Sequence, residues 1–433
     1  MIELPPKFEI DKLLENNLQL YFEISSELLI SINNEYLYWD RVKYKSKNHR
    51  PEELWNAVKF SRFVKQTPFL FNKYLFKYVF TEYIQQMLHF LDMNIGGTLT
   101  SNVGIAESDK EKFLVSSIME EAIASSQMEG AVTTRKKAKE MLQKELRPKS
   151  ISEQMILNNY NTIKYIAQSK SEKLSSEELL YIHSLITKDT LDKKDEEGAY
   201  RTNDNIYVVN HSTSEVVHNP PSYIELPQLI NALCTFFNTE SQNFIHPIIK
   251  GIIIHFMVAW IHPFSDGNGR TARALFYWYL LKNGYWLTEY LSISRIIKDT
   301  KSQYEKSFLY TENDENDLSY FITYNLKTMK KAYDALKEYI NHKQKEVNQA
   351  AKFLRISNVN ERQAQILKLI YDDSDRVLSV KEMENRFLIS GYTARTDLKG
   401  LVNLGLLKAI NVNKKKQNFI KSANFEKIIS SYK

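Results

Sequence analysis

Residues 262–273 read HPFSDGNGRTAR, a stretch that combines a histidine, a carboxylate, two glycines and two arginines. Histidine titrates near neutral pH, so His262 is a candidate general base for a hydroxyl group. Asp266 supplies a hard oxygen ligand that suits Mg²⁺. Arg270 and Arg273 would share one face of a helix, where two guanidinium groups can hold an anion. These residue types predict an active site that handles phosphate.

Apolar residues on both sides predict that this stretch is a loop between two buried helices. Residues 249–260 are almost wholly apolar, and residues 272–281 are mostly apolar again. Gly267 and Gly269 can adopt positive φ without a steric penalty, so the backbone N–H groups around them can turn toward one anion. The second helix would add the positive end of its dipole at the same point.

The sequence from His262 to Arg273 resembles the HxFx(D/E)GNGRxxR signature of the Fic (filamentation induced by cAMP) family. The resemblance implies an α-helical core that transfers AMP from ATP to a hydroxyl side chain of a protein. By position, His262 would deprotonate the target Ser, Thr or Tyr, and Asp266 would hold Mg²⁺ against the α- and β-phosphates. It also implies further phosphate contacts: Gly267, Asn268 and Gly269 as a cradle, Arg270 for the β-phosphate and Arg273 for the γ-phosphate.

A second segment, residues 125–130 with the sequence SSQMEG, resembles the inhibitory (S/T)xxxE(G/N) motif of the same family. The preceding residues predict a helix that ends near Gly130, which leaves Glu129 in a last turn that favours a neighbouring cation. The resemblance implies that Ser125, Glu129 and Gly130 form the motif and that Glu129 pairs with Arg273. ATP would then be kept from its productive position. In some relatives the same glutamate positions a water for AMP removal, so a reverse activity stays open.

Residues 203–219 predict a β-hairpin that resembles the family's flap. Two short β-like runs, residues 205–210 and 215–218, flank a polar turn. The open edge of such a hairpin could pair with an extended target segment, and we expect docking at Ile206, Tyr207 and Val208. A plain surface hairpin is the alternative interpretation.

The last part of the chain carries all of the net charge. Residues 358–433 contain 14 Lys+Arg and 8 Asp+Glu, a surplus of 6 that equals the net charge of the whole chain. The order of helices and strands resembles a winged helix-turn-helix with residues 392–404 as recognition helix. DNA contacts are expected at Thr393, Arg395, Lys399 and, on the wing, Lys415. Winged helices also bind proteins, so the partner of this domain stays open.

The length of 433 residues predicts two or three domains, and the family resemblance implies a mainly α fold with a small β-hairpin flap. No apolar run approaches the roughly 20 residues of a membrane span, and the N-terminal residues lack signal-peptide features, so we expect a cytoplasmic protein. A single cysteine, Cys234, excludes a disulfide within the chain. The expected organisation is a helical extension (1–105), a Fic core (106–335) with its inhibitory helix at about 112–130, a connecting helix (336–357) and a winged helix (358–433).

Three functions from different classes are compatible with this sequence. The first is an AMP transferase that uses ATP and Mg²⁺, is inhibited by Glu129 and modifies a protein hydroxyl, including its own. The second is a DNA-binding regulator whose core acts as a sensor. The third is a transferase of another phosphate-containing group. Tyr285 and Tyr304 resemble aromatic positions near the nucleotide, although core packing explains them equally well. A homodimer is compatible with a winged-helix protein.

Overall fold

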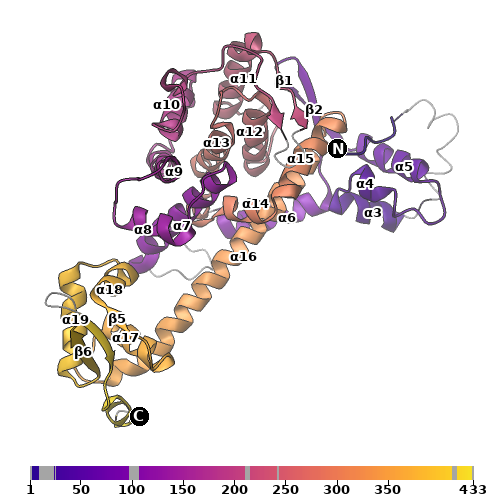
Figure 1. Cartoon of the computed structure of the whole chain (residues 1–433). Helices are drawn as coiled ribbons and strands as arrows, with labels where there is room; N and C mark the ends of the chain where they lie inside the picture. Colours follow the sequence, from indigo (N-terminus) through magenta and orange to yellow (C-terminus); the bar gives the residue numbers. More distant parts are fainter. Residues whose placement is uncertain are drawn as a thin grey trace. The chain divides into compact units, whose positions relative to one another are not determined.

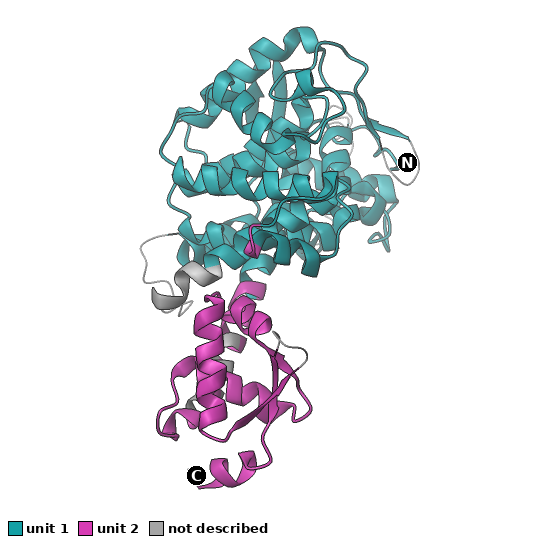
Figure 2. Cartoon of the chain, turned by 60° about the vertical axis from the view of Figure 1, so that its left-hand side comes forward, with its two compact units in different colours: residues 1–102, 113–142, 146–334 teal, residues 103–112, 143–145, 335–433 magenta. Residues whose placement is uncertain are grey.

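The computed structural model describes residues 2–8, 24, 26–96, 107–209, 215–240, 243–411 and 417–431. They group into two compact units, which Figure 2 shows in different colours. Unit 1 comprises residues 1–102, 113–142 and 146–334, and unit 2 comprises residues 103–112, 143–145 and 335–433.

Unit 1 is mainly helical, which confirms the predicted fold class. Its helices are α3 (Ser26–Glu35), α4 (Trp39–Val42), α5 (Pro51–Phe63), α6 (Glu82–Ile95), α9 (Ile151–Gln168), α10 (Ser176–Thr187), α11 (Leu226–Asn238), α12 (Pro247–Ile261), α13 (Asn268–Lys282), α14 (Ile293–Asp299) and α15 (Lys301–Asn313). Three further helices have residues in both units: α7 (Glu107–Met128), α8 (Arg135–Gln143) and α16 (Ser319–Ala350).

Helices α12 and α13 form the centre of unit 1 and flank the motif loop. They lie side by side, and α9, α10 and α11 pack around them (Figure 1). Every residue of α13 from Arg270 to Leu281 is buried, and α12 is buried on nearly all sides. A helix that is enclosed all round has little freedom to shift, so the loop between them has fixed ends.

The N-terminal segment is not helical throughout, which corrects the prediction for residues 1–105. Strand β1 (Gln66–Phe71) pairs with β2 (Tyr74–Val79) in an antiparallel hairpin. Phe69 and Phe71 are buried while the residue between them is exposed. This period-two burial of aromatic side chains is the strand pattern that a helical interpretation of the segment overlooks.

Buried polar contacts attach the N-terminal segment to the end of α15. Lys59 Nζ lies 2.6 Å from a carboxylate oxygen of Asp314, and both side chains are buried. The Tyr36 hydroxyl donates a hydrogen bond of 2.6 Å to Asp317. Because a buried ion pair is costly to break by removing one partner, these contacts fix the segment against the core.

The predicted flap is a short hairpin in the structure. Strand β3 (Val208–Val209) pairs with β4 (Val216–His218), with a register shift, and residues 210–214 lie outside the described part of the chain. The first strand is shorter than the predicted run of residues 205–210, because the chain before it turns. There the Asp204 carboxylate accepts hydrogen bonds from across the hairpin base, from the Ser222 hydroxyl and the Tyr223 N–H.

Unit 2 has the topology of a winged helix and confirms that prediction. Its elements after α16 are α17 (Glu361–Asp372), β5 (Leu378–Ser379), α18 (Val380–Phe387), α19 (Gly391–Asn403), β6 (Leu407–Asn411), β7 (Gln417–Lys421) and α20 (Phe425–Ser430). The strands form one antiparallel sheet in the order β5–β7–β6. Ser379 and Ser390 cap α18 and α19 by accepting backbone N–H groups, as the sequence signal of a polar N-cap requires. Helix α20 was not predicted.

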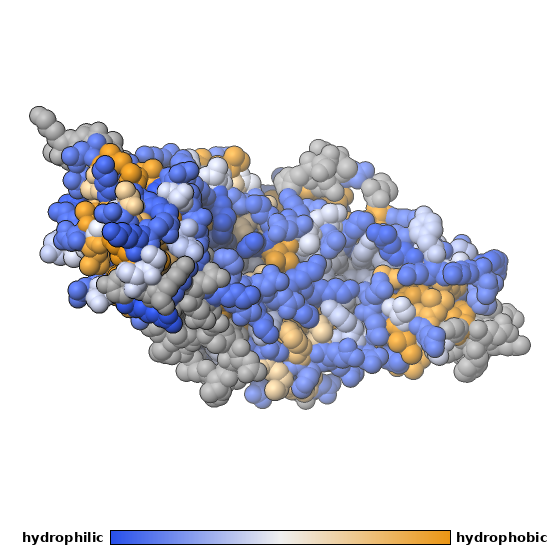
Figure 3. Space-filling model, turned by 90° about the horizontal axis from the view of Figure 1, so that it is seen from below, coloured by the Kyte–Doolittle hydropathy of each residue, from blue (hydrophilic) through white to orange (hydrophobic). Residues whose placement is uncertain are grey.

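The surface drawn in Figure 3 is mainly hydrophilic, with small separate apolar areas. Among the helices that the structure describes, none combines the length and the apolar character needed to cross a membrane.

Candidate active site

The motif loop begins where α12 ends, at His262. This residue adopts a left-handed conformation (φ 50°), and its N–H donates to the Val258 carbonyl at 3.1 Å. The loop ends at Gly267, which has φ 79° and forms the N-cap of α13. A Cβ at Gly267 would come within 2.9 Å of the Thr187 side chain, so this position needs glycine for both conformation and space.

Side chains behind the loop hold its shape. The Asn268 amide donates to the Phe264 carbonyl at 2.8 Å and accepts from the Phe264 N–H at 3.0 Å. His183 of α10 stacks on Phe264 with ring centroids 3.7 Å apart. Its Nδ1 accepts from the Gly198 N–H, so Nε2 carries the proton and donates to the Asp266 carbonyl at 2.9 Å. The Asn268 side chain is therefore occupied by the loop, which leaves its backbone N–H to face an anion.

Arg201 ties the loop to the base of the flap. Its Nε donates to the His262 carbonyl at 3.0 Å, and its backbone N–H donates to the Pro263 carbonyl. The same guanidinium pairs with Asp204 at 2.8 Å and contacts the Pro221 carbonyl. No motif spacing in the sequence pointed to His183 or to the contacts of Arg201.

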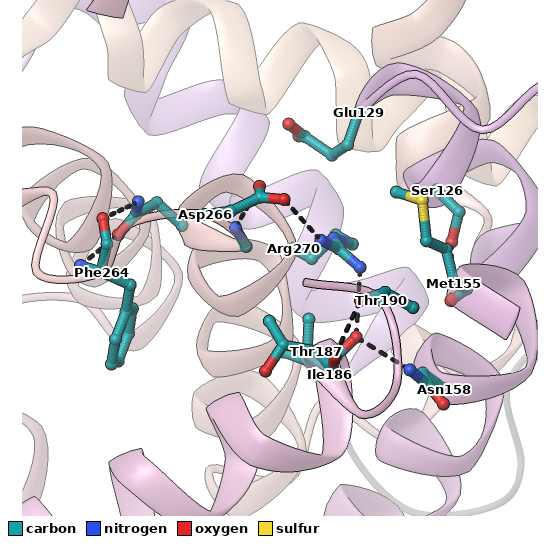
Figure 4. A network of polar contacts seen from close by, with 12 residues as sticks. Ser126, Glu129, Met155, Asn158, Ile186, Thr187, Thr190, Phe264, Asp266 and Arg270 are labelled. Carbon is teal, nitrogen blue, oxygen red and sulfur yellow. Dashed lines mark hydrogen bonds and ion pairs between the residues drawn. The ribbon is translucent and has the colours of Figure 1, made fainter. Parts of the chain in front are cut away.

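Arg270 presents unused donors at the start of α13. Its side chain is fully buried, and one nitrogen donates to the Ile186 carbonyl at 3.1 Å (Figure 4). Two further guanidinium nitrogens, Nε and Nη2, are buried without a hydrogen-bond partner among the described atoms. Burial lowers the pKa of Arg270. Buried charged donors without partners are costly, and the oxygens of a bound anion would satisfy them.

Asp266 faces outward from the same loop. Its side chain is 58% exposed, and one carboxylate oxygen lies 3.7 Å from Arg270 Nη2. No cluster of three or more His, Cys, Asp or Glu ligands exists among the residues that the structure describes. Mg²⁺ is commonly held by one or two carboxylates together with substrate phosphates. One exposed carboxylate beside an anion site fits that mode and does not fit an ion held by protein ligands alone.

Glu129 forms an ion pair with Arg273, the second arginine of the motif. Its carboxylate oxygen lies 2.8 Å from Arg273 Nη2. Ser125 contacts the same guanidinium through its hydroxyl at 2.9 Å and its carbonyl at 3.1 Å. Burial raises the pKa of Glu129, but the charge and hydrogen bond of Arg273 outweigh it and hold the pKa below its ordinary value. Arg273 therefore contacts both Glu129, as the resemblance implied, and Ser125 of the same motif.

Gly130 follows the end of α7 with φ 93°, a conformation that favours glycine. The helix before it is fixed to the core from the other side as well. The buried Glu121 carboxylate accepts the Ser294 N–H at 2.9 Å, and Asn159 donates to the Ala122 carbonyl at 3.3 Å. The position of Glu129 is thus set by a docked helix and not by its ion pair alone.

Gly269 lies directly beneath the Glu129 carboxylate, inside α13 and without positive φ. A Cβ there would come within 2.3 Å of the Glu129 oxygen and 3.3 Å of Arg273 Nη1. The sequence assigned this glycine to a turn, but the structure shows that space is what requires it.

We expect Gly269→Ala to lower the free energy of unfolding of unit 1 by about 1–2 kcal/mol, because the new methyl group displaces Glu129 from Arg273. In a Glu129→Gly background the same change should raise the free energy of unfolding by about 0.4–1 kcal/mol, because alanine restricts the backbone conformations of the unfolded chain. Tryptophan fluorescence during denaturant unfolding measures both, since all 5 tryptophans lie at residues 39–286. Equal effects in the two backgrounds would contradict the contact.

A cavity of about 210 Å³ adjoins the motif loop. Its wall includes His262, Glu129, Gly269 and Arg273, together with the flap residues Val208, Val209, Val217 and His218 and the α15 residues Lys301, Tyr304, Glu305, Phe308, Leu309 and Glu312. Of the predicted docking residues, Val208 lines the cavity, whereas Ile206 and Tyr207 precede the strand and do not line it. Of the two tyrosines that resemble aromatic positions near the nucleotide, Tyr304 lines the cavity and Tyr285 does not. The Tyr285 hydroxyl donates a hydrogen bond to Asp92.

The His262 ring has the protonation state of a base. Its Nδ1 faces the Ala259 carbonyl at 3.3 Å and must carry the proton for that contact, which leaves Nε2 with a free lone pair. Burial is the main cause that lowers the pKa of His262 to about 4. The ring is therefore neutral near pH 7.

In unit 2, α19 exposes one face of mixed polar and basic side chains. Tyr392 is 83% exposed, and Arg395, Thr396 and Lys399 are exposed beside it. Thr393 is partly exposed, because its N–H and hydroxyl contact the capping Ser390. The predicted wing residue Lys415 lies outside the described residues.

Asp397 fixes the opposite face of α19. It is buried and accepts two hydrogen bonds from Arg362, at 2.7 and 3.2 Å, and one from Asn360 at 3.0 Å. The exposed face is therefore held outward by contacts within unit 2.

Together, the fold and the site define a helical domain with unpartnered arginine donors at a helix N-terminus beside a neutral histidine, in a chain that also carries a winged helix. Residues 173–280 match the Fic/DOC family, and residues 362–410 match the DeoR-like helix-turn-helix domain. The chain thus contains a Fic/DOC family domain followed by a DeoR-like helix-turn-helix domain.

Curated relatives match around the Fic domain. One is "Protein adenylyltransferase Fic" of Drosophila mojavensis, 34% identical over 142 residues, which are 32% of this chain and 26% of that protein. Another, with the same name, is from Nematostella vectensis, 29% identical over 133 residues, 30% of this chain and 29% of that protein. The matches thus cover under a third of these relatives.

Solved structures support the fold. A Fic family protein from Desulfovibrio desulfuricans superposes with a TM-score of 0.52 at 20% identity, covering 80% of this chain and 98% of that one. Fic-1 from C. elegans gives a TM-score of 0.50 at 18% identity, covering 73% and 84%. At these identities the likeness concerns the fold alone.

Proposed function

We propose that this protein transfers AMP from ATP to a hydroxyl group of a protein and that Glu129 holds it in an inhibited state. The observation that carries the proposal is the content of a single site: a neutral base, a buried arginine with unused donors and a second arginine occupied by a carboxylate. The matched curated relatives bear the name protein adenylyltransferase, which agrees with this chemistry.

In the proposed reaction, His262 Nε2 accepts the proton of a Ser, Thr or Tyr hydroxyl. The hydroxyl oxygen attacks the α-phosphorus of ATP, the bond from that phosphorus to the bridging oxygen breaks, and pyrophosphate leaves. The products are an AMP ester of the protein and pyrophosphate. Such a displacement requires mainly positioning and charge stabilisation, together with one base.

The phosphate groups would be held by the start of α13. The first N–H groups of a helix have no partner within it, so those of Asn268 and Gly269 can donate to phosphate oxygens. The unpartnered nitrogens of Arg270 would meet the β-phosphate. Mg²⁺ bound by Asp266 would neutralise charge on the α- and β-phosphates.

Glu129 inhibits this reaction, in the proposal, by taking the place of the γ-phosphate on Arg273. Ser125 and Glu129 together occupy the Nε and Nη2 donors of Arg273, so a γ-phosphate would have to displace the Glu129 carboxylate to use this edge of the guanidinium. ATP could then bind only without a contact between its γ-phosphate and Arg273. Its α-phosphorus would not lie in line with the attacking hydroxyl. Release of Glu129 would restore Arg273 to the nucleotide.

The target segment would dock on the flap. Tyr207 is 52% exposed and Val209 is 42% exposed, so side chains beside β3 are free for contact. An extended segment could add to the edge of this two-stranded hairpin and present its hydroxyl to His262. Ile206 to Val208 remain our docking residues, and the protein's own hydroxyl groups are among the expected targets.

Two labelled nucleotides test the proposal. The Glu129→Gly variant, with Mg²⁺ and cell lysate, should transfer label to protein from ATP labelled at the α-phosphate and not from ATP labelled at the γ-phosphate. Label from the γ-phosphate alone would show phosphoryl transfer instead. Absence of label from both, with ATP still bound, would reject AMP transfer.

The exposed face of α19 favours a second activity, DNA binding by unit 2. Basic and hydroxyl side chains on one face of the second helix of a helix-turn-helix fit contact with phosphates and base edges. The two activities do not exclude each other, because they use different units.

Binding of the full chain to duplex DNA should weaken steeply as salt rises, since each phosphate contact releases counterions. Arg395→Ala should weaken binding and reduce the slope of log affinity against log salt by about 1. A fluorescence-anisotropy titration at several salt concentrations measures both. Lys427→Ala in α20 is the control, because it removes the same positive charge from a helix other than α19. A flat salt response would reject phosphate contact.

A further inference from the structure

His218, the last residue of β4, joins three elements at the wall of the cavity. Its Nε2 lies 2.8 Å from the carbonyl oxygen of Trp260 in α12. Its Nδ1 lies 2.7 Å from a carboxylate oxygen of Glu312 in α15. The ring is buried, and both His218 and Glu312 line the same cavity as His262. A single side chain thus connects the flap with the end of α12 and with α15.

Both partners of the ring are hydrogen-bond acceptors. A carbonyl oxygen and an ionised carboxylate have no proton to donate, so both ring nitrogens must carry protons for both bonds to form. His218 is therefore an imidazolium ion in this arrangement. Burial alone would lower the pKa of His218, but the hydrogen bond and charge of Glu312 outweigh it, and the pKa is raised.

The Trp260 carbonyl lies in the last turn of α12, where carbonyl groups have no partner within the helix. His262 follows two residues later in its left-handed conformation. A hydrogen bond on Trp260 therefore steadies the turn that orients the His262 ring. The positive charge also opposes protonation of that ring: after burial, the main cause, His218 contributes to the lowered pKa of His262.

We propose that His218 is a positioning residue for the proposed AMP transfer: as an imidazolium held by Glu312, it fixes the last turn of α12 and keeps His262 unprotonated. The purpose of this role rests on the proposed function. Its geometry rests on the two hydrogen bonds of the His218 ring. Arg201, whose guanidinium holds the His262 carbonyl, lowers the pKa of both His218 and His262, whereas the Glu129 carboxylate raises the pKa of His262. The flap is thereby seated by the same contacts that prepare the base.

The titration of the His262 ring tests this role without any need for catalysis. It can be followed by NMR in the full chain with ¹³C-labelled histidine. Glu312→Gln keeps a hydrogen-bonding side chain but removes the charge that stabilises the imidazolium, and His218→Gln keeps a donor for Trp260 but removes the cation. Both variants should raise the midpoint of the His262 titration by roughly 0.5–1 pH unit.

A matched control exists at the other end of α12. His246 pairs with Asp92 at 3.0 Å, so His246→Gln removes a comparable histidine–carboxylate pair far along the helix from His262. It should leave the His262 midpoint unchanged. If both test variants fold and the midpoint does not move, or if it moves equally in the control, the positioning role is wrong.

Activity provides the second readout. In the Glu129→Gly background, the acid limb of the pH–rate profile should move up with the NMR midpoint. If the protein transfers AMP but the His262 midpoint does not move in the two test variants, the role of His218 is wrong and the proposed function stands. A moved midpoint in a protein that transfers no AMP would reject the proposed function and support the coupling between the two rings.

Discussion

Replacing Glu129 with glycine should raise the initial rate of AMP transfer by about 10- to 100-fold. The carboxylate accepts a charge-assisted hydrogen bond of 2.8 Å from Arg273. Such bonds are worth about 1.5–3 kcal/mol, and about 1.4 kcal/mol corresponds to a factor of ten in rate. Without the carboxylate, Arg273 is free for the γ-phosphate. Incorporation of α-phosphate label over time measures the change.

Glu120→Gly is the matched control. Glu120 lies in α7, the helix that Glu129 follows, but it pairs with Arg135 and Lys139 and does not line the cavity. Glycine at this position loosens α7 without freeing Arg273, so the rate should stay near that of the wild type. Equal activation by both variants would attribute inhibition to the docking of α7. An unchanged rate in Glu129→Gly would remove the inhibitory assignment.

His262→Ala, introduced into the Glu129→Gly protein, should lower the rate of transfer by about 10²- to 10⁴-fold, the usual contribution of a general base. The affinity for ATP should change little, because the ring donates to Ala259 and its Nε2 is directed to the target hydroxyl in the proposal. Initial rates give the first quantity, and calorimetric titration with ATP gives the second.

His89→Ala serves as the control for that loss, since His89 is an exposed histidine of α6 and does not line the cavity. Its rate should equal that of the parent. Retention of full activity without His262 would mean that another group accepts the proton. Parallel loss of ATP binding would mean that His262 acts in nucleotide binding instead.

The motif loop could be predicted because its residue types and their spacing constrain one another. Two glycines that can adopt positive φ, two arginines three apart and a polar loop between apolar helices leave few arrangements. The resemblance also placed Glu129 against Arg273, residues separated by 144 positions, and the structure has them in contact.

The residues that hold the loop could not be predicted, because nothing in their local sequence indicates a partner. The sequence around His183 is that of an ordinary amphipathic helix. The stacking of His183 on Phe264 depends on how α10 packs. Asn268 fits a phosphate cradle by position, yet its amide closes on the loop backbone. The β1–β2 hairpin was missed for a related reason: its aromatic alternation competes with a helical pattern until the packing of both faces is known.

The most direct test of the account is to determine where an ATP analogue lies in the wild type and in Glu129→Gly. Crystal structures of both, with Mg²⁺ and an analogue that cannot be cleaved between the α- and β-phosphates, would show the γ-phosphate. We expect the γ-phosphate to contact Arg273 only in the variant, while Glu129 remains paired with Arg273 in the wild type. A γ-phosphate on Arg273 in the wild type, with the ion pair to Glu129 intact, would contradict it.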